Sequence, residues 1–259
     1  MKGLPVRLRC ENSTSHRSAN ITLELWNCLT QIDGRIQRPR SLLTPSPPSA
    51  TISPGWALAL RDFRMKTLDE YLQDAERAHG HLCAGQVLGV RMAMRGLQRL
   101  GIGDPVRERK RLVTFVEIDR CATDAVAVVT GCRLGKRALK FRDWGKVAAT
   151  FVDLATHRAV RIAAKEGSKA LACSLFPEIA DKNRQQMAAY REMPDQDLFE
   201  ERWVEVDIPP EDLPGYKGER TVCAACGEDI NFKREVVENG RVLCRACSGE
   251  SYYKVVSPP

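Results

Sequence analysis

No part of this sequence is apolar over a long stretch. The longest hydrophobic runs are interrupted by charged residues, and none approaches the roughly 20 residues needed to span a bilayer. The first residues, MKGLPVRLRC, also lack the apolar segment of a secretory signal. These absences exclude a membrane-spanning protein, and we expect the chain to be cytoplasmic.

A large excess of charge is also missing from most of the chain. The net charge of +7 is concentrated in residues 1–64, where nine Lys and Arg residues outnumber four Asp and Glu residues. The remaining residues carry a net charge of only +2, which gives little support to a large phosphate-binding surface. We therefore do not expect nucleic acid to be a partner of the folded part.

The 259 residues exceed the size of most single domains, and the sequence predicts three parts. Residues 1–64 lack regular periodicity and include a Pro/Ser-rich stretch, so we expect a disordered or weakly ordered tail rather than a folded subdomain. Residues 65–214 carry helix and strand patterns and form the expected core domain. Residues 215–259 form a small cysteine-rich module. Met65 begins the first patterned region, and translation starting there is an alternative.

Helical patterning begins after Thr67, which is expected to cap a helix with Glu70 as its capping-box partner and Gly80 near its end. A second helix follows, in which apolar residues recur from Cys83 at steps of four and three. Another face of this helix contains only small residues, Gly85, Gly89, Ala93 and Gly96. Such a face permits the close approach of a neighbouring helix or chain.

The rest of the core domain mixes strand and helix patterns, and no internal repeat is visible. Strands are expected in residues 111–119, 145–164 (a pair around a polar turn) and 202–210, and helices in residues 121–131 and 181–191. This order predicts an α+β fold in which helices pack on a mainly antiparallel sheet.

Four cysteines near the C-terminus have the spacing of a zinc site. Cys223 and Cys226 form one Cys-x-x-Cys pair, Cys244 and Cys247 form another, and 17 residues separate the pairs. Two intervening residues let both thiolates of a pair reach one tetrahedral ion. We expect a zinc ribbon or treble clef, with a hairpin turning at residues 238–240 between the pairs.

Two redox-active dithiols are the alternative for these cysteines. So few hydrophobic residues surround them that metal binding would have to provide the folding free energy, which favours zinc. The role of the module is open between a structural or protein-binding function and nucleic-acid binding.

A second group of metal-binding residue types lies in the core domain. His79, His81 and Cys83 fall within five positions at the expected start of a helix, and Gly80 frees the backbone between the two histidines. If Cys83 lies in the first helical turn, the helix dipole favours its thiolate form. The same reasoning applies to Cys121, at a predicted strand-to-helix junction.

Further candidates follow Cys121 in the sequence. They are Asp124, Cys132, Lys136 and Lys146. The segment around Lys136 loosely resembles a phosphate loop, but its glycine spacing is one residue short and the following Ser/Thr is missing. A lysine in a cysteine-lined pocket, holding an anionic ligand or stabilising a thiolate, is one interpretation, and a solvated turn lysine is the other.

Two segments resemble a known family. HGHLCAGQVLGVRMAMRGL is similar to the His-Gly-His-x-Cys-Pro-Gly and Leu-Gly-x-Arg motifs of the FmdE family of formylmethanofuran dehydrogenase proteins. VEIDRCATDAVAVVTGCRLGKRALKFRDWGKVAATF resembles the second conserved block of that family. Ala84 stands where the family usually has Pro, and Arg133 replaces the usual Thr. The resemblance covers residues 71–176, and the C-terminal module is similar to the zinc-finger tail of many members.

The resemblance implies a dimeric α+β core and a site for metal or thiol chemistry. Carried over residue by residue, the metal ligands would be His79, His81, Cys83 and Cys121. The catalytic residues would be Cys83, Cys121 and Lys136. The residues that bind a cofactor would be Asp124, Cys132 and Lys146. A mixed imidazole and thiolate set suits zinc or iron as the second metal.

Two hypotheses of function follow. The first is a cytoplasmic, dimeric metal-binding protein, an accessory or redox component related to molybdenum or tungsten formylmethanofuran dehydrogenase and part of a larger oxidoreductase complex. The second is a non-enzymatic regulator or subunit that uses its zinc finger to bind protein or nucleic acid. Whether the chain is itself an enzyme is left open.

Overall fold

The computed structural model describes residues 65–256 and residue 258, so the tail expected over residues 1–64 lies outside the described residues. The helices of the core domain are α1 Leu68–His79, α2 Ala84–Leu100, α3 Cys121–Thr130, α4 Ser168–Leu175, α5 Lys182–Glu192 and α6 Asp195–Leu198, with 3-10 turns at Leu134–Lys136 and Pro210–Asp212. Its strands are β1 Leu112–Val116, β2 Leu139–Phe141, β3 Ala148–Asp153, β4 Arg158–Ala164 and β5 Phe199–Val204.

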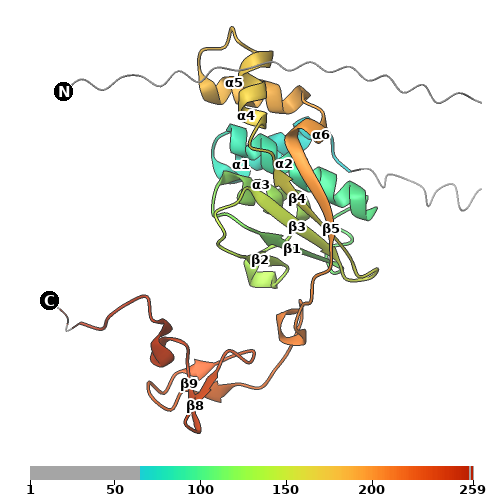
Figure 1. Ribbon diagram of the computed structural model, residues 1–259. Helices are drawn as coiled ribbons and strands as arrows, with labels where there is room; N and C mark the ends of the chain where they lie inside the picture. The colour runs from blue at the N-terminus through green and yellow to red at the C-terminus, as the bar shows by residue number, and fades with distance from the viewer. Residues whose placement is uncertain (1–64, 257, 259) are drawn as a thin grey trace, which may run out of the picture. The chain divides into compact units, whose positions relative to one another are not determined.

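The five strands form one sheet in the order β2-β1-β3-β4-β5 (Figure 1). Only β1 and β2 are parallel, and the other neighbours are antiparallel. β3 and β4 form the expected hairpin, and their register places Phe151 opposite Val160. The prediction of an α+β fold with a mainly antiparallel sheet is confirmed.

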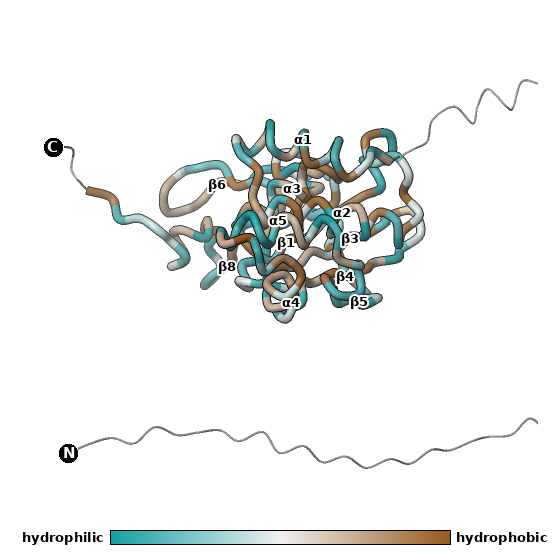
Figure 2. Tube along the Cα trace, turned by 90° about the horizontal axis from the view of Figure 1, so that it is seen from above, coloured by the Kyte–Doolittle hydropathy of each residue, from teal (hydrophilic) through white to brown (hydrophobic). Residues whose placement is uncertain are grey.

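The start of α1 follows the sequence signal closely. The Thr67 side chain accepts a hydrogen bond from the Glu70 backbone N–H, and the Glu70 carboxylate accepts one from the Thr67 N–H, which completes the predicted capping box. Gly80 ends the helix with a φ of 93°, a left-handed conformation that glycine adopts without strain. Figure 2 shows α1 with hydrophilic residues along one side and hydrophobic residues towards the rest of the domain.

The small-residue face of α2 packs where a side chain would not fit. A Cβ on Gly89 would lie 2.4 Å from the Ala122 backbone oxygen. Only glycine at this position therefore allows α3 to lie this close to α2. A Cβ on Gly96 would lie 2.3 Å from the ring of Phe151 in β3. The expected close approach is therefore confirmed, and the main hydrophobic core lies between these helices and one face of the sheet.

The other face of the sheet is covered by a nearby segment of the same chain. Val113, Val152 and Ala159 are buried there, and Val206 and Ile208 pack against them. The strand expected over residues 202–210 is wrong in its bounds, because β5 begins at Phe199 and ends at Val204. The alternating apolar residues after Val204 serve packing rather than strand pairing.

Some elements were not expected from the sequence. Strand β2 has three residues and pairs in parallel with β1, and such a short segment carries no readable alternation. Helices α4 and α6 were also missed, since α6 has only four residues and α4 begins without a side-chain cap. None of the helices in the described part of the chain is long and apolar enough to cross a membrane.

The C-terminal module contains two small hairpins. β6 Thr221–Val222 pairs with β7 Asp229–Ile230, and β8 Val236–Glu238 pairs with β9 Arg241–Leu243. The second hairpin turns at Asn239 and Gly240, both with positive φ, as expected for a tight turn of this composition. A short helical segment, Ala246–Glu250, follows.

A buried ion pair fixes the turn region of the sheet. Asp153, whose side chain is 0% exposed, accepts hydrogen bonds from Arg111 Nε at 2.8 Å and Nη2 at 2.5 Å. The Ala155 N–H and the Thr156 hydroxyl also donate to this carboxylate. Hydrogen bonding to Arg111 is the main cause that lowers the pKa of Asp153 to about 2.

We expect Asp153→Asn to lower the free energy of unfolding by about 2 kcal/mol at neutral pH, because a carboxylate with a depressed pKa stabilises the fold while it is ionised. This contribution is present above the pKa of the unfolded state, about 4, and is lost as pH falls towards about 2. Chemical denaturation across this pH range measures the effect, with the exposed Asp143→Asn as the control. Equal stability of the two variants at neutral pH would contradict the prediction.

Candidate metal centres

The four cysteines of the C-terminal module converge on one point. Each offers a sulfur, and all four sulfurs of Cys223, Cys226, Cys244 and Cys247 lie within 4.8 Å of one another. The Cys226 and Cys244 sulfurs are 3.9 Å apart. Tetrahedral zinc with Zn–S bonds of about 2.3 Å places its sulfurs about 3.8 Å apart. The cluster therefore has the dimensions of a four-thiolate zinc site.

The local charges also favour a divalent cation. Backbone N–H groups, first that of Cys226 and then that of Cys244, lower the pKa of Cys223 to about 6. The neighbouring thiol groups, first that of Cys244, raise the pKa of Cys247 to about 12. Four thiolates this close repel one another, so a cation at the centre is what allows all of them to be ionised.

We expect Cys223→Ser to remove one zinc per chain and to unfold the module. Its hydrophobic cluster contains only three buried residues, Cys223, Ile230 and Leu243, which is too little to hold the fold without metal. Elemental analysis and limited proteolysis of residues 215–259 measure the two effects, with the exposed Cys173→Ser as the matched control. A full zinc content in Cys223→Ser would refute the prediction.

The second cluster lies where α1 ends and α2 begins. His79 is the last residue of α1, the left-handed Gly80 reverses the chain, and Cys83 is the N-cap of α2. A ring nitrogen of His79, a ring nitrogen of His81 and the sulfur of Cys83 all lie within 4.8 Å of one another. The two imidazole ring centroids are also 4.8 Å apart. The turn therefore brings together three of the residues that the sequence proposed as metal ligands.

Asp124 holds one of these histidines in place. Its Oδ2 lies 2.8 Å from His79 Nδ1, and the contact joins the first turn of α3 to the last residue of α1. A histidine that donates Nδ1–H to a carboxylate keeps Nε2 available as a ligand, which is a common arrangement behind metal-bound imidazoles. The structure thus places Asp124 behind His79, and the cofactor binding expected for it stays a prediction.

Cys121 lies beside this group as the first residue of α3. Burial is the main cause that raises the pKa of its thiol, followed by a hydrogen bond with the Cys83 side chain. A Cβ on Gly85 would lie 3.1 Å from Cys121 Cβ and 3.7 Å from Cys83 Sγ, so the small residue at this position leaves room for both thiols. Cys121 is not within 4.8 Å of all three donors, and it adjoins the group rather than completing it.

Three other candidates lie elsewhere. Cys132 follows α3, about 15 Å along the helix from Cys121. It is buried in the core, where it accepts a hydrogen bond from the Thr114 hydroxyl at 3.5 Å. Lys136, in a 3-10 turn, and Lys146, before β3, are exposed. The structure does not bring these residues into the cluster of histidines and Cys83.

Two residues at the cluster were missed by the sequence analysis. Gln86 is fully buried and donates from Nε2 to the Cys121 carbonyl at 2.7 Å, which ties α2 to the start of α3. Asn183 of α5 accepts a hydrogen bond from the Ala84 N–H at 3.0 Å and so caps α2 from outside. Both act through tertiary contacts between distant segments, and no local sequence signal could have identified them.

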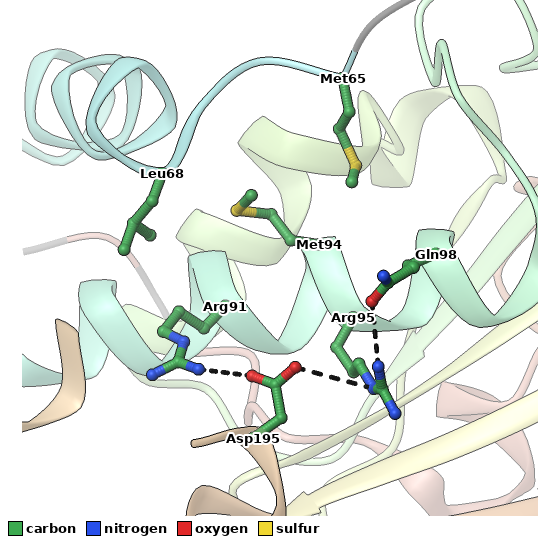
Figure 3. Close-up of a pocket in the computed structure, with 7 residues that line it drawn as sticks. All are labelled: Met65, Leu68, Arg91, Met94, Arg95, Gln98 and Asp195. Atoms are coloured by element: carbon green, nitrogen blue, oxygen red, sulfur yellow. Dashed lines mark hydrogen bonds and ion pairs between the residues drawn. The ribbon is translucent and has the colours of Figure 1, made fainter. Parts of the chain in front are cut away.

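A separate pocket of about 250 Å³ lies between the start of α1, α2 and α6 (Figure 3). Met65, Leu68 and Met94 provide its apolar wall. Asp195 lies between two arginines, at 2.5 Å from Arg91 and 3.8 Å from Arg95. No residue of the histidine and cysteine cluster lines this pocket, so it is distinct from the candidate core centre.

Comparison with known families matches both parts of the chain. Residues 78–200 match the family described as "FmdE, Molybdenum formylmethanofuran dehydrogenase operon". Residues 217–253 match the "Prokaryotic dksA/traR C4-type zinc finger". The candidate core centre falls inside the first match, and the four-cysteine centre inside the second.

Individual proteins are similar as well. A protein of Archaeoglobus fulgidus named "Probable S-adenosyl-L-methionine-binding protein" is 32% identical over an alignment of 211 residues, and the match covers 73% of this chain. The matched region spans only 55% of that protein's length. The crystal structure of a tungsten formylmethanofuran dehydrogenase FmdE-like protein from Syntrophus aciditrophicus is 21% identical, with a TM-score of 0.51, and covers 75% of this chain and 98% of that one. At this identity the likeness shows a shared fold.

Proposed function

We propose that this chain is a protein with two metal centres, a zinc finger and a transition-metal site in the core. The support is that residues 78–200 match the FmdE family and residues 217–253 match a four-cysteine zinc finger. The observation that carries the proposal is the convergence of His79, His81 and Cys83 within 4.8 Å. The carboxylate of Asp124 behind His79 supports it, since that contact orients the imidazole as a ligand.

The two centres differ in what they can do. Four thiolates close the coordination sphere of zinc, so the C-terminal centre is structural. The core group has three donors that lie within 4.8 Å of one another, and His81 is exposed, which leaves room for a water or a substrate as a further ligand. Imidazole and thiolate donors suit zinc or iron rather than magnesium or calcium. Cys121, next to Cys83, is the candidate for a fourth protein ligand or for thiol chemistry.

We place this site in an accessory or redox component of a formylmethanofuran dehydrogenase type of complex, acting in the cytoplasm as a homodimer. The support for such a complex is the description of the matched family, which names the operon of that enzyme. The name of the Archaeoglobus relative adds S-adenosylmethionine as a ligand to test by calorimetry.

A second candidate function is a regulator or subunit that binds a partner protein through the zinc finger. The module exposes large apolar side chains, among them Val237 (66% exposed) and Tyr252 (96% exposed). Apolar residues on such a small module are typical of a surface that binds protein. This function does not need a metal in the core.

Metal quantification separates the two candidates. We expect two metal ions per chain in protein purified without chelators, and one in Cys83→Ala and in His81→Ala, because the core centre loses a third of its closely placed donors. Cys173→Ala, an exposed cysteine in α4, is the control and should keep both ions. A single ion per chain that survives Cys83→Ala would instead favour the interaction function.

Asp124→Asn should weaken metal binding at the core centre by about 10- to 100-fold, because a second-sphere carboxylate fixes the orientation of His79. Competition with a chromophoric chelator measures the affinity. The exposed Asp119, which precedes α3, provides the matched control as Asp119→Asn. Unchanged affinity in Asp124→Asn would show that His79 does not need this contact.

A further inference from the structure

A larger cavity lies at the end of the sheet, apart from both metal centres. It has a volume of about 540 Å³ and lies where β4 ends and β5 begins, with further walls from α2, α4, α5 and the loop before β3. None of the histidines and cysteines of the metal centres lines it. Cavities of this volume are typical of sites for small molecules.

The charge on its walls is positive. Five lining residues are cationic, namely Lys146, Arg161, Lys165, Lys169 and Arg202. Two are anionic, Glu166 and Glu200, so the lining carries a net charge of +3. With the buried Glu117, which pairs with Arg161 behind the wall, the cluster keeps a net charge of +2. Lys169 pairs with Glu166 at 3.0 Å. Helix α4, which begins at the cavity, has no acidic residue in its first turn to offset the charge.

The two arginines of the lining lie directly opposite each other. Arg161 of β4 and Arg202 of β5 are partners in the antiparallel register, and like charges at such positions destabilise a sheet. The buried Glu117 compensates Arg161 with two hydrogen bonds of 2.7 Å. Within residues 65–256, Arg202 forms its ion pair with the exposed Glu200 on its own strand, at 2.5 Å. An anion in the cavity would relieve the remaining repulsion.

The other walls are apolar. Leu88 of α2, Val147, Ala163 and Ala164 line the cavity together with Tyr190 of α5. A ligand that fits this cavity has an anionic end for the guanidinium and ammonium groups and a less polar body for these walls. Arginine forks match phosphate oxygens in pairs, and lysines add point charges.

We propose that this cavity binds a small molecule that carries a phosphate monoester. The phosphate group lies against Arg202, Lys169 and Lys146, and the organic part contacts the apolar wall. The site goes beyond the two metal centres proposed above, and binding at this cavity does not depend on a metal ion.

Adenosine monophosphate is the probe, since it combines a phosphate monoester with a flat organic body. Titration calorimetry at low ionic strength should show binding with a Kd below about 1 mM and at least about tenfold weaker binding of adenosine, which lacks the charge. Arg202→Gln and Lys169→Gln should each weaken the binding of adenosine monophosphate by about tenfold, the value of one charge-assisted hydrogen bond. Lys110→Gln, an exposed lysine in the loop before β1, should leave the binding unchanged.

Several results would overturn the proposal. The first is that neither adenosine monophosphate, ribose 5-phosphate nor inorganic phosphate binds. The second is that Lys110→Gln weakens the binding of adenosine monophosphate as much as Arg202→Gln does, since this would indicate unspecific charge attraction. Succinate binding as tightly as ribose 5-phosphate would reject the assignment to phosphate. Loss of binding in Cys83→Ala would show that phosphate binds at the core metal centre instead. Retained binding in that variant supports the cavity even if the core centre proves to hold no metal. Thermal melting of each variant confirms that it is folded.

Discussion

The close packing of α2 on α3 is the constraint on which the core centre depends. Gly89 allows it, because a Cβ there would overlap the backbone of Ala122. With the two helices this close, the first residue of α3, Cys121, reaches the N-cap of α2, Cys83. One turn along α3, Asp124 reaches His79. These pairs of residues are about 40 positions apart in sequence. The contact that brings them together is made by Gly89 and Ala122.

The four-cysteine centre and the proposed core centre depend on different sources of stability. In the C-terminal module a metal ion held by the four cysteines has to replace a hydrophobic core, because only Cys223, Ile230 and Leu243 are buried there. The core centre lies instead at the edge of a domain that is already held by hydrophobic packing and by ion pairs such as Arg111 with Asp153. Loss of metal is thus expected to unfold one part of the chain and to leave the other folded.

Local signals were sufficient for much of the fold. The capping box at Thr67 and Glu70, the helix starting at Cys121 and the two Cys-x-x-Cys pairs depend on neighbouring residues, and the structure has them as expected. Contacts between distant segments could not be read in this way. Tertiary packing sets the hydrogen bond from Gln86 to the Cys121 carbonyl and the burial of Cys132 beside Thr114. It also sets the packing of Val206 and Ile208 on the sheet after β5.

The position of His79 at the end of α1 has a consequence for how an ion could enter and leave. Terminal turns open more readily than the middle of a helix, and Gly80 allows the backbone there an unusually wide choice of conformations. Fraying of this last turn would withdraw one imidazole while Cys83, held at the start of α2, stays in place. The proposed core centre therefore has a route for exchanging a metal ion that does not require the domain to unfold.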